Sequence, residues 1–139
     1  MFQKILVAYD GSPHSERALA TAIEIAKCAS ASITLLNAYD KIPPNLGEPN
    51  FQEALNQTVV IARDMTLKVL AQVRGEGLTA DMNVLEGPAP DAILRVAETE
   101  GYDLIVIGSR GLGQFQGLLI GSVSDRVLHH AKIPVLIVR

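Results

Sequence analysis

Short apolar runs alternate with longer segments of helical spacing along the whole chain. The apolar runs are rich in β-branched residues and predict strands, and the segments between them predict helices. The strands are expected at residues 4–9, 32–39, 79–85, 104–107 and 134–138, and the helices at about 13–26, 51–74, 87–100 and 122–131. Strands that are almost uniformly apolar and alternate with helices are typical of a parallel sheet covered on both faces. The pattern therefore predicts an α/β fold.

The segment boundaries carry suitable capping and turn residues. Ser12 can cap a helix whose first residue is Pro13, where a missing N–H has no cost. The 51–74 helix is expected to stop at Gly75-Glu-Gly77. Residues 40–50 hold three prolines, a glycine and two asparagines, so they are expected to form an irregular surface segment.

Length and composition favour one domain spanning residues 1–139. A net charge of −3 and the lack of a Lys/Arg-rich run argue against nucleic-acid binding. No stretch reaches the roughly 18 consecutive apolar residues that a membrane helix needs, and the first residues lack the features of a signal peptide. The single cysteine, Cys28, cannot form an internal disulfide, which favours a reducing compartment. We therefore expect a cytoplasmic protein with no nucleic-acid or membrane partner.

A glycine-rich stretch follows the fourth predicted strand. Its glycines are Gly108, Gly111, Gly113, Gly117 and Gly121. Glycines let a backbone take positive φ and approach a ligand without a Cβ in the way. The helix expected from Ser122 adds N–H groups and the positive end of its dipole, which favour an anion. The stretch therefore predicts a phosphate cradle.

Asp10 directly follows the first predicted strand, so its carboxylate and the glycine-rich stretch both leave carboxyl ends of strands. Ligands of parallel sheets bind beyond these ends, where the strand order reverses. If the strands at 4–9 and 104–107 are neighbours at that point, the carboxylate and the cradle converge on one crevice.

Two common nucleotide motifs do not fit the chain. It contains no Walker A string, which excludes a P-loop NTPase, and the run 111–117 has one residue too many for a dinucleotide fingerprint. What remains is an uncharged glycine loop with the hydroxyls of Ser109, Ser122 and Ser124. Such a loop is suited to holding phosphates by backbone N–H and hydroxyl donation.

The loop resembles the nucleotide motif of the universal stress protein family, which is Gly-x-x-Gly, nine residues, then Gly-Ser/Thr. The matching residues are Gly108, Gly111, Gly121 and Ser122. The strand ends at Asp10-Gly-Ser and Leu35-Leu-Asn-Ala-Tyr-Asp40 and the closing run 134–138 also look like that family, so the resemblance covers the whole chain. Members that carry the glycine motif bind ATP.

The resemblance implies a fold, a ligand and an assembly. The fold is a three-layer α/β/α sandwich with a five-stranded parallel sheet of order 3-2-1-4-5, the Rossmann-like fold of the adenine nucleotide alpha hydrolase-like group. The ligand is ATP with Mg²⁺ or Mn²⁺. The assembly is a homodimer that pairs through the C-terminal strand, residues 134–138.

The resemblance also implies roles for single residues. Asp10 would contact the ribose or a metal near the phosphates, since Mg²⁺ takes oxygen ligands and bridges phosphates. Ala38 would meet adenine through its backbone. The residues implied around the triphosphate are Gly108, Ser109, Arg110, Gly111, Gly121, Ser122, Val123 and Ser124.

Some of these residues also have simpler structural interpretations. Asp10 can be a turn residue that bonds its own backbone, and Gly108 and Gly111 can serve strand-to-helix packing. Residues 122–125 form a plain capping box, which would still present free N–H groups. Arg110 can be a solvated surface residue instead of a phosphate ligand.

Three functions therefore stay open from the sequence. The leading hypothesis is an ATP-binding universal stress protein that acts as a nucleotide-responsive homodimer with at most slow ATP hydrolysis, because the loop offers one nearby arginine, no lysine and no obvious base. A second is an adenine-nucleotide alpha hydrolase-like enzyme; the string Asp10-Gly-Ser-Pro-His-Ser15 departs from the Ser-Gly-Gly-x-Asp-Ser loop of adenylating members. A third is an interaction module that binds no nucleotide.

Overall fold

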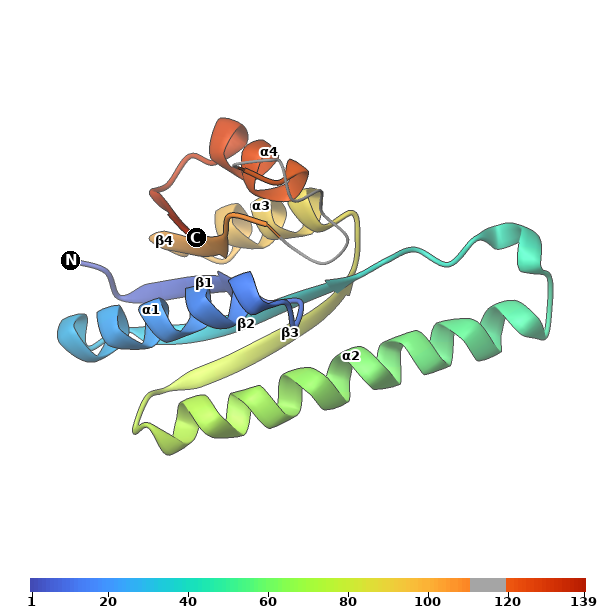
Figure 1. The fold of residues 1–139 in the computed structure, drawn as a ribbon, viewed down its shortest axis with the longest axis horizontal. Coiled ribbons are helices and arrows are strands. Elements are labelled where there is room, and N and C mark those ends of the chain that lie inside the picture. Colours follow the sequence, from blue (N-terminus) through green and yellow to red (C-terminus); the bar gives the residue numbers. More distant parts are fainter. Residues whose placement is uncertain (111–119) are drawn as a thin grey trace.

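The computed structural model describes residues 1–110 and 120–139. Its centre is a five-stranded parallel sheet of order β3-β2-β1-β4-β5, as predicted (Figure 1). The strands are β1 (Lys4–Ala8), β2 (Ser32–Tyr39), β3 (Ala80–Glu86), β4 (Leu104–Gly108) and β5 (Val135–Val138). The first strand lies in the middle and pairs with β2 on one side and β4 on the other, so the strand order reverses there.

Helices cover both faces of the sheet. They are α1 (Pro13–Ala29), α2 (Asn50–Gly75), α3 (Ala89–Thr99) and α4 (Ser122–His130), with a short 3₁₀ helix, η1 (Pro44–Leu46), between β2 and α2. The helices α1 and α2 pack on one face, and α3 and α4 pack on the other (Figure 1). This confirms the predicted three-layer α/β/α arrangement, with small shifts at the ends of the elements.

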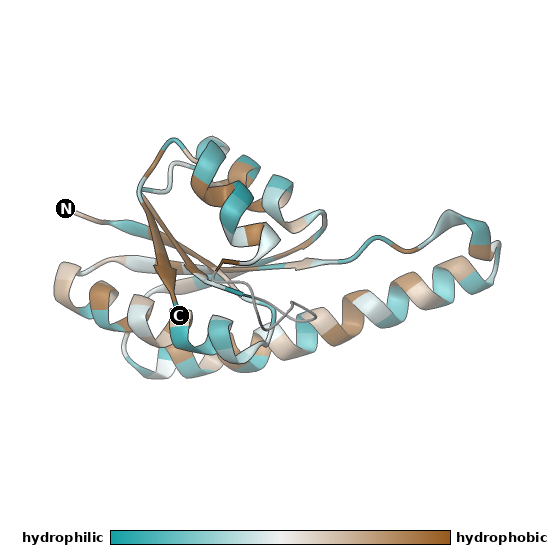
Figure 2. Ribbon diagram, turned by 45° about the horizontal axis from the view of Figure 1, so that its top comes forward, coloured by the Kyte–Doolittle hydropathy of each residue, from teal (hydrophilic) through white to brown (hydrophobic). Residues whose placement is uncertain are grey.

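Alternate residues of the central strand enter two separate cores. Ile5 and Val7 face α1 and α2, whereas Leu6 faces α3 and α4. All three are 0 % exposed, and full burial of such a side chain stabilises the fold by about 1.5–3 kcal/mol. Figure 2 shows the strands as largely hydrophobic and the helices as two-faced. The strands therefore read as continuous apolar runs because both of their faces are covered.

The turn from β1 into α1 has the geometry that the sequence predicts. Gly11 takes a φ of +82°, which a glycine adopts without steric cost. The hydroxyl oxygen of Ser12 accepts a hydrogen bond from the amide of Ser15 at 3.1 Å, and Pro13 is the first helical residue. This capped turn fixes where the α1 backbone leaves the carboxyl end of β1.

The segment between β2 and the middle of α2 forms an arm that extends beyond the sheet (Figure 1). We call residues 40–61 the arm. The buried residues of α2 begin only at Ala62, and Leu46, Val60 and Ile61 are exposed. The sequence predicts residues 40–50 as irregular, and the structure adds η1 within them. The sheet therefore supports only the second half of α2.

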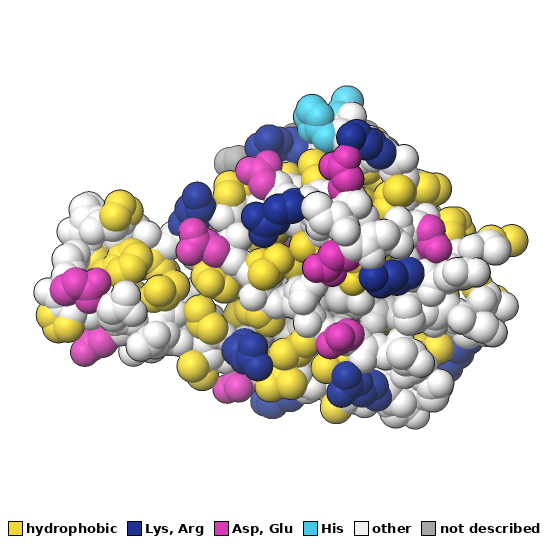
Figure 3. Space-filling view, turned by 180° about the vertical axis from the view of Figure 1, so that it is seen from behind, with side chains coloured by type: hydrophobic (Ala, Val, Ile, Leu, Met, Phe, Trp, Pro, Cys, Tyr) yellow, Lys and Arg dark blue, Asp and Glu magenta, His cyan; other side chains and the backbone are white. Residues whose placement is uncertain are grey.

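Acidic and basic side chains are interspersed on the face opposite to the view of Figure 1 (Figure 3). This mixture accords with the lack of a Lys/Arg-rich run in the sequence. Within residues 1–110 and 120–139, no helix combines the length and apolar character needed to cross a membrane.

Candidate functional site

A cavity of about 360 Å³ opens at the carboxyl ends of β1, β2 and β4. It lies where the strand order reverses, which is the position where parallel α/β sheets bind ligands. The sequence-predicted residues that line it are Asp10, Ala38, Gly108, Arg110, Gly121, Val123 and Ser124. Ser109 and Ser122 are not among the described lining residues, and Gly111 lies outside the described part of the chain. The fold thus brings most of the predicted site together.

Asp10 combines a turn role with a place in the cavity wall. Its Oδ1 accepts a hydrogen bond from the amide of Ser12 at 2.9 Å, which is an Asx turn. The amide of Asp10 in turn donates to the hydroxyl of Ser15 at 3.4 Å. The simpler interpretation of Asp10 is therefore correct for one oxygen, and the turn holds the carboxylate at the cavity.

Ala38 turns its backbone toward the cavity. The carbonyl of Leu36 accepts from the amide of Tyr9 at 2.9 Å, whereas the carbonyl of Tyr39 accepts from the amide of Gly87 on the β3 side at 2.7 Å. Backbone groups of successive residues point to opposite edges of a strand, so Ala38, two residues after Leu36, faces the same way as Leu36. The last β1 residue in the ladder pairs with Leu36. The N–H and C=O of Ala38 therefore point past the end of β1.

The described glycines of the predicted cradle do not use positive φ. Gly121 has a φ of −74°, and Gly108 is not among the described positive-φ residues. A Cβ on Gly108 would lie 2.8 Å from the carbonyl carbon of His14. The prediction of positive φ is therefore wrong for these two residues, and the packing interpretation holds for Gly108. Gly111, Gly113 and Gly117 lie outside the described residues.

The start of α4 differs from the predicted capping box. Gly121, not Ser122, is the N-cap residue, and Ser122 is the first helical residue. Since Gly121 has no side chain, the box formed by residues 122–125 is absent and that prediction is wrong. The amide of Asp125 donates to the Gly121 carbonyl at 2.9 Å, which starts the helical ladder. The first turn, with Val123 and Ser124 at the cavity, still offers amides that have no acceptor within the helix.

Ser109 is a buried junction between three elements. It is 2 % exposed, and its amide donates to the Val138 carbonyl of β5 at 2.7 Å. Its carbonyl accepts from the amide of Gly121 and, at 2.9 Å, from the hydroxyl of Ser124. Its Oγ lies 3.2 Å from Nδ1 of His14. These bonds hold the start of α4 against the end of β4.

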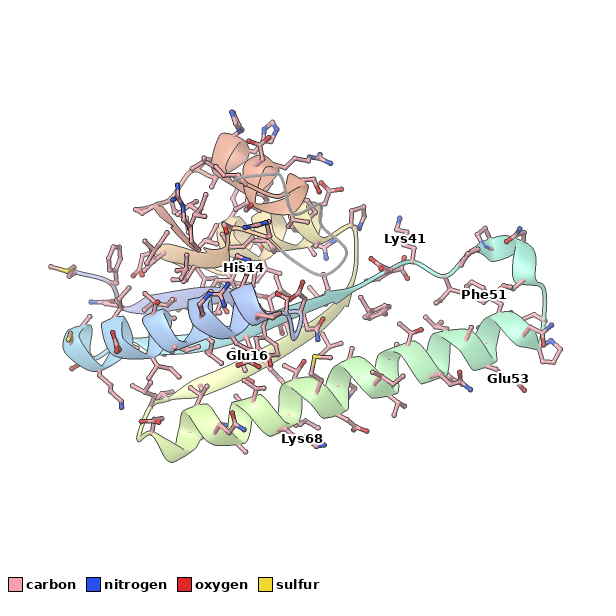
Figure 4. All side chains as sticks on the ribbon, viewed as in Figure 1. His14, Glu16, Lys41, Phe51, Glu53 and Lys68 are labelled. Atoms are coloured by element: carbon pink, nitrogen blue, oxygen red, sulfur yellow. The ribbon has the colours of Figure 1, made fainter. Side chains whose placement is uncertain are left out.

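His14 is a residue of this region that the sequence reasoning missed. It lies in the first turn of α1 and leaves that turn on the side opposite to Glu16 (Figure 4). Burial lowers its pKa from the ordinary value of 6.5, the charges of Arg17 and Arg110 lower it further, and the charge of Asp10 opposes them. The only available signal was its place two residues after the Ser12 cap. That place is typical of any helix start, so it did not indicate a contact with β4.

Within residues 1–110 and 120–139, no group of three or more His, Cys, Asp or Glu side chains could hold a metal ion. Two carboxylates, those of Asp10 and Asp40, line the cavity. Magnesium is commonly held by one or two carboxylates together with substrate phosphates and waters. The donor set therefore fits a metal that arrives with a phosphorylated ligand.

The sheet order and the crevice at its reversal point define a doubly wound α/β protein with a ligand site at the switch between β1 and β4. A profile of the universal stress protein family matches residues 1–139. A universal stress protein of Thermus aquaticus, encoded in the QAH/OAS sulfhydrylase 3′ region, is 41% identical over 140 residues that cover 100% of both chains. The chain belongs to the universal stress protein family.

Solved structures agree with this assignment. Hypothetical protein MJ0577, solved as a test case of structural genomics, superposes with a TM-score of 0.91 at 27% identity, over 99% of this chain and 96% of that one. A universal stress protein in complex with cAMP superposes with a TM-score of 0.68 at 26% identity, over 99% and 97% of the two chains.

Proposed function

We propose that this chain binds ATP, together with Mg²⁺ or Mn²⁺, in the crevice at the carboxyl ends of β1, β2 and β4, and acts as a nucleotide-responsive homodimer. The observation that carries the proposal is the backbone of Ala38, which faces the crevice where β1 has ended. The structural relative in complex with cAMP supports an adenine nucleotide as the ligand.

Ala38 can recognise adenine by backbone groups alone. Its N–H matches the N1 acceptor of the adenine ring, and its C=O matches the exocyclic amino donor. Guanine presents a carbonyl and a ring N–H at these positions, so both pairings would be lost. Each unpaired buried polar group costs about 1–3 kcal/mol, which makes the contact selective. Apolar side chains that line the same cavity, Leu36, Ile93 and Ile107, suit the faces of the base.

The first turn of α4 is the proposed phosphate site. The amides of Val123 and Ser124 lie at the cavity, and a helix N-terminus adds partial positive charge. The hydroxyl of Ser124 donates to the carbonyls of Ser109 and Gly121, at 2.9 and 3.1 Å, so its contribution to phosphate binding is the backbone amide. Arg110 lines the same cavity and adds positive charge near the phosphates.

Asp10 is the proposed metal and ribose ligand. The Asp10 carboxylate would hold Mg²⁺, which would supply positive charge to neutralise the phosphates. The Asx turn and the Ser12 cap fix the Asp10 backbone, so the carboxylate is oriented before any ligand arrives. Asp10 and the first turn of α4 line the same cavity, which supports the proposal that one nucleotide contacts both.

ATP hydrolysis in this crevice is proposed to be slow. Phosphoryl transfer depends on an oriented water and on charge that stabilises the transition state. Among the described residues, the ionisable groups that line the cavity are Tyr9, Asp10, Tyr39, Asp40 and Arg110. Burial raises the pKa of Tyr9, and the neighbouring Glu16 carboxylate, which accepts a hydrogen bond from the Tyr9 hydroxyl, raises it further. Tyr9 therefore stays protonated and cannot act as the base.

The proposed dimer pairs the outer edges of two β5 strands. This strand is the last of the sheet, and its four residues are all partly exposed. The carbonyls of Pro134 and Val138 accept from β4 and from Ser109 just beyond it, so the backbone groups of Val135 and Ile137 point to the outer edge. An exposed apolar edge is a template for pairing with another strand, and two such edges can close around a twofold axis.

The test is nucleotide binding by calorimetry with purified protein. The wild type should bind MgATP and reject MgGTP. Gly121→Val should bind at least tenfold more weakly, because a branched side chain would enter the cavity at the α4 N-cap. Gly75→Val lies at the distant end of α2, where an added Cβ would meet no atom within 4 Å. It is the matched control and should bind like the wild type.

A second pair of variants isolates the backbone contact. Ala38→Pro removes the N–H that faces the crevice but leaves the β3 ladder intact, because that ladder uses Tyr39. Ala38→Val keeps the N–H and should retain adenine binding. Equal affinities of the two variants for MgATP, with unchanged circular dichroism, would defeat the proposed recognition of the base.

A further inference from the structure

The thioether of Met65 packs directly against the turn that carries Asp10. This methionine lies on α2, and a Cβ added to Gly11 would come within 2.9 Å of its Sδ and 3.3 Å of its Cε. Gly11 has a φ of +82°, so the turn and the thioether share a space that no larger residue at position 11 could enter. Any new atom on the sulfur must therefore avoid Gly11.

The same sulfur contacts a second residue of the crevice. Nδ2 of Asn37 lies 3.9 Å from Sδ of Met65 and donates to Oγ1 of Thr66 at 3.1 Å. Asn37 is 6 % exposed and lines the cavity. Met65 itself is partly exposed, so a small oxidant can reach it. One sulfur atom thus touches both the Asp10 turn and a buried side chain of the cavity wall.

We propose that Met65 is an oxidation site whose conversion to methionine sulfoxide by a peroxide weakens nucleotide binding in the crevice. This inference rests on the proposed function, because nucleotide affinity is what the modification would change. It concerns a residue that does not itself line the cavity and that acts through Gly11 and Asn37.

The chemistry is a two-electron oxygen transfer. A lone pair of Sδ attacks one oxygen of hydrogen peroxide, an S–O bond forms and the O–O bond breaks. The departing oxygen takes the proton of the transferred oxygen and leaves as water. The sulfur is oxidised and the peroxide is reduced. Methionine sulfoxide reductases reverse the change, so the modification is a reversible one.

The new oxygen turns an apolar contact into a polar one. A sulfoxide oxygen is a strong acceptor and needs a donor when it is partly buried. Among the described residues, the Asn37 amide is the donor already placed beside the sulfur. The amide nitrogen has two N–H donors, so it can donate to the sulfoxide as well as to Thr66, but the added oxygen needs space between Sδ and Nδ2 and the larger head group presses on Gly11. Both responses displace residues next to the proposed ribose and base positions.

The experiment uses the full chain in a Cys28→Ser background, because Cys28 is exposed and peroxide would oxidise it too. The chain has three methionines, and Met82 is partly exposed like Met65, so it serves as the internal comparison. Protein is treated with graded hydrogen peroxide. Peptide mass spectrometry gives the oxidised fraction at each methionine, and calorimetry gives the MgATP affinity of the same samples.

We expect MgATP affinity to fall about tenfold in step with oxidation of Met65, and methionine sulfoxide reductase to restore it. Met65→Leu, which fills a similar volume without an oxidisable sulfur, should bind MgATP before and after peroxide. Met82→Leu keeps Met65, so after peroxide treatment it should lose MgATP affinity as the parent does. Saturating MgATP should slow oxidation at Met65 several-fold relative to Met82, because bound nucleotide would hold the Asp10 turn and Asn37 in place.

The outcomes separate this inference from the proposed function. If the untreated parent binds no adenine nucleotide, the proposed function itself is wrong. If the parent binds MgATP but full oxidation of Met65 leaves its affinity unchanged, the inference is wrong and the proposed function stands. Resistance of Met65 to peroxide that fully oxidises Met82 would also overturn it, as would an equal loss of affinity in Met65→Leu.

Discussion

The α-carbon of Gly108 lies directly against the backbone of His14. A Cβ at position 108 would come within 2.8 Å of both the carbonyl carbon and the Cβ of His14, and within 2.9 Å of its carbonyl oxygen. The end of β4 and the start of α1 therefore approach each other so closely that a Cβ at position 108 would not fit without a shift of the backbone. This contact holds the α1 turn with Asp10 and the α4 turn at one crevice.

Gly108→Ala should destabilise the protein. The added methyl group meets backbone atoms that cannot rotate away, and overpacking of this kind costs about 1–3 kcal/mol. Urea unfolding followed by circular dichroism should show a lower midpoint with an unchanged slope. The control is Gly75→Ala, where a Cβ meets no atom within 4 Å; it should be neutral or stabilise by about 0.5 kcal/mol. Equal midpoints for both variants would contradict the packing role of Gly108.

Asp10→Asn should separate the turn role of Asp10 from its proposed ligand role. An amide oxygen still accepts the bond from the Ser12 amide, so the unfolding midpoint should stay close to that of the wild type. The charge that would hold Mg²⁺ is lost, so MgATP affinity should fall at least tenfold, or about 1.4 kcal/mol. Calorimetry with Mg²⁺ and with EDTA measures this. Identical MgATP affinities would rule out a role for the carboxylate charge.

His14 should make the folded state less stable in mild acid. Its folded pKa lies below the unfolded value of 6.5, chiefly because of burial, so the unfolded chain binds the proton more readily. The stabilising contribution is complete above pH 6.5 and is lost as pH falls through the lowered folded pKa. His14→Gln should remove this dependence. The check is the difference in unfolding free energy between wild type and variant from about pH 7.5 to about pH 4.5, and a flat difference would be contrary evidence.

Ile137→Pro should separate the proposed dimer without unfolding the chain. The Ile137 amide points to the outer edge of β5, so proline removes a donor that the β4 ladder does not use. Light scattering at micromolar concentration should give the mass of one chain for the variant and of two for the wild type. Leu136→Pro, whose amide faces β4 by the same alternation, should instead lower the unfolding midpoint. A wild type that is monomeric at this concentration would refute the dimer.

The sequence was sufficient for the fold because apolar periodicity and capping residues agreed. Ser12 and Pro13 mark the start of α1 by local chemistry alone, and the structure has the predicted cap. The apolar runs identified every strand, since both faces of each central strand are buried. Single-residue details at the start of α4 were not predictable, because Ser122 and Gly121 are both acceptable N-cap residues. The hydrogen bond from the Gly121 amide to the Ser109 carbonyl favours Gly121, and this bond depends on tertiary structure.

The candidate site was predicted in part for the same reason. Asp10 and Ala38 lie at the ends of strands, and the carboxyl ends of parallel strands meet at one edge of the sheet, so their convergence followed from topology. His14 and Met65 were missed because their contacts join segments far apart in the sequence. No periodicity or spacing indicates that His14 would lie against Gly108, or that Met65 would lie against Gly11.

The arm has a consequence for how this molecule moves through solvent. Residues 40–61 project beyond the sheet, so friction on the chain is greater than on a sphere of equal mass (Figures 1 and 4). Elution volume and diffusion rate will therefore report an apparent size above that of a rounded 14.9 kDa particle. A single chain can therefore elute at the volume expected of a larger protein, so the number of subunits should be determined by a method that measures mass directly.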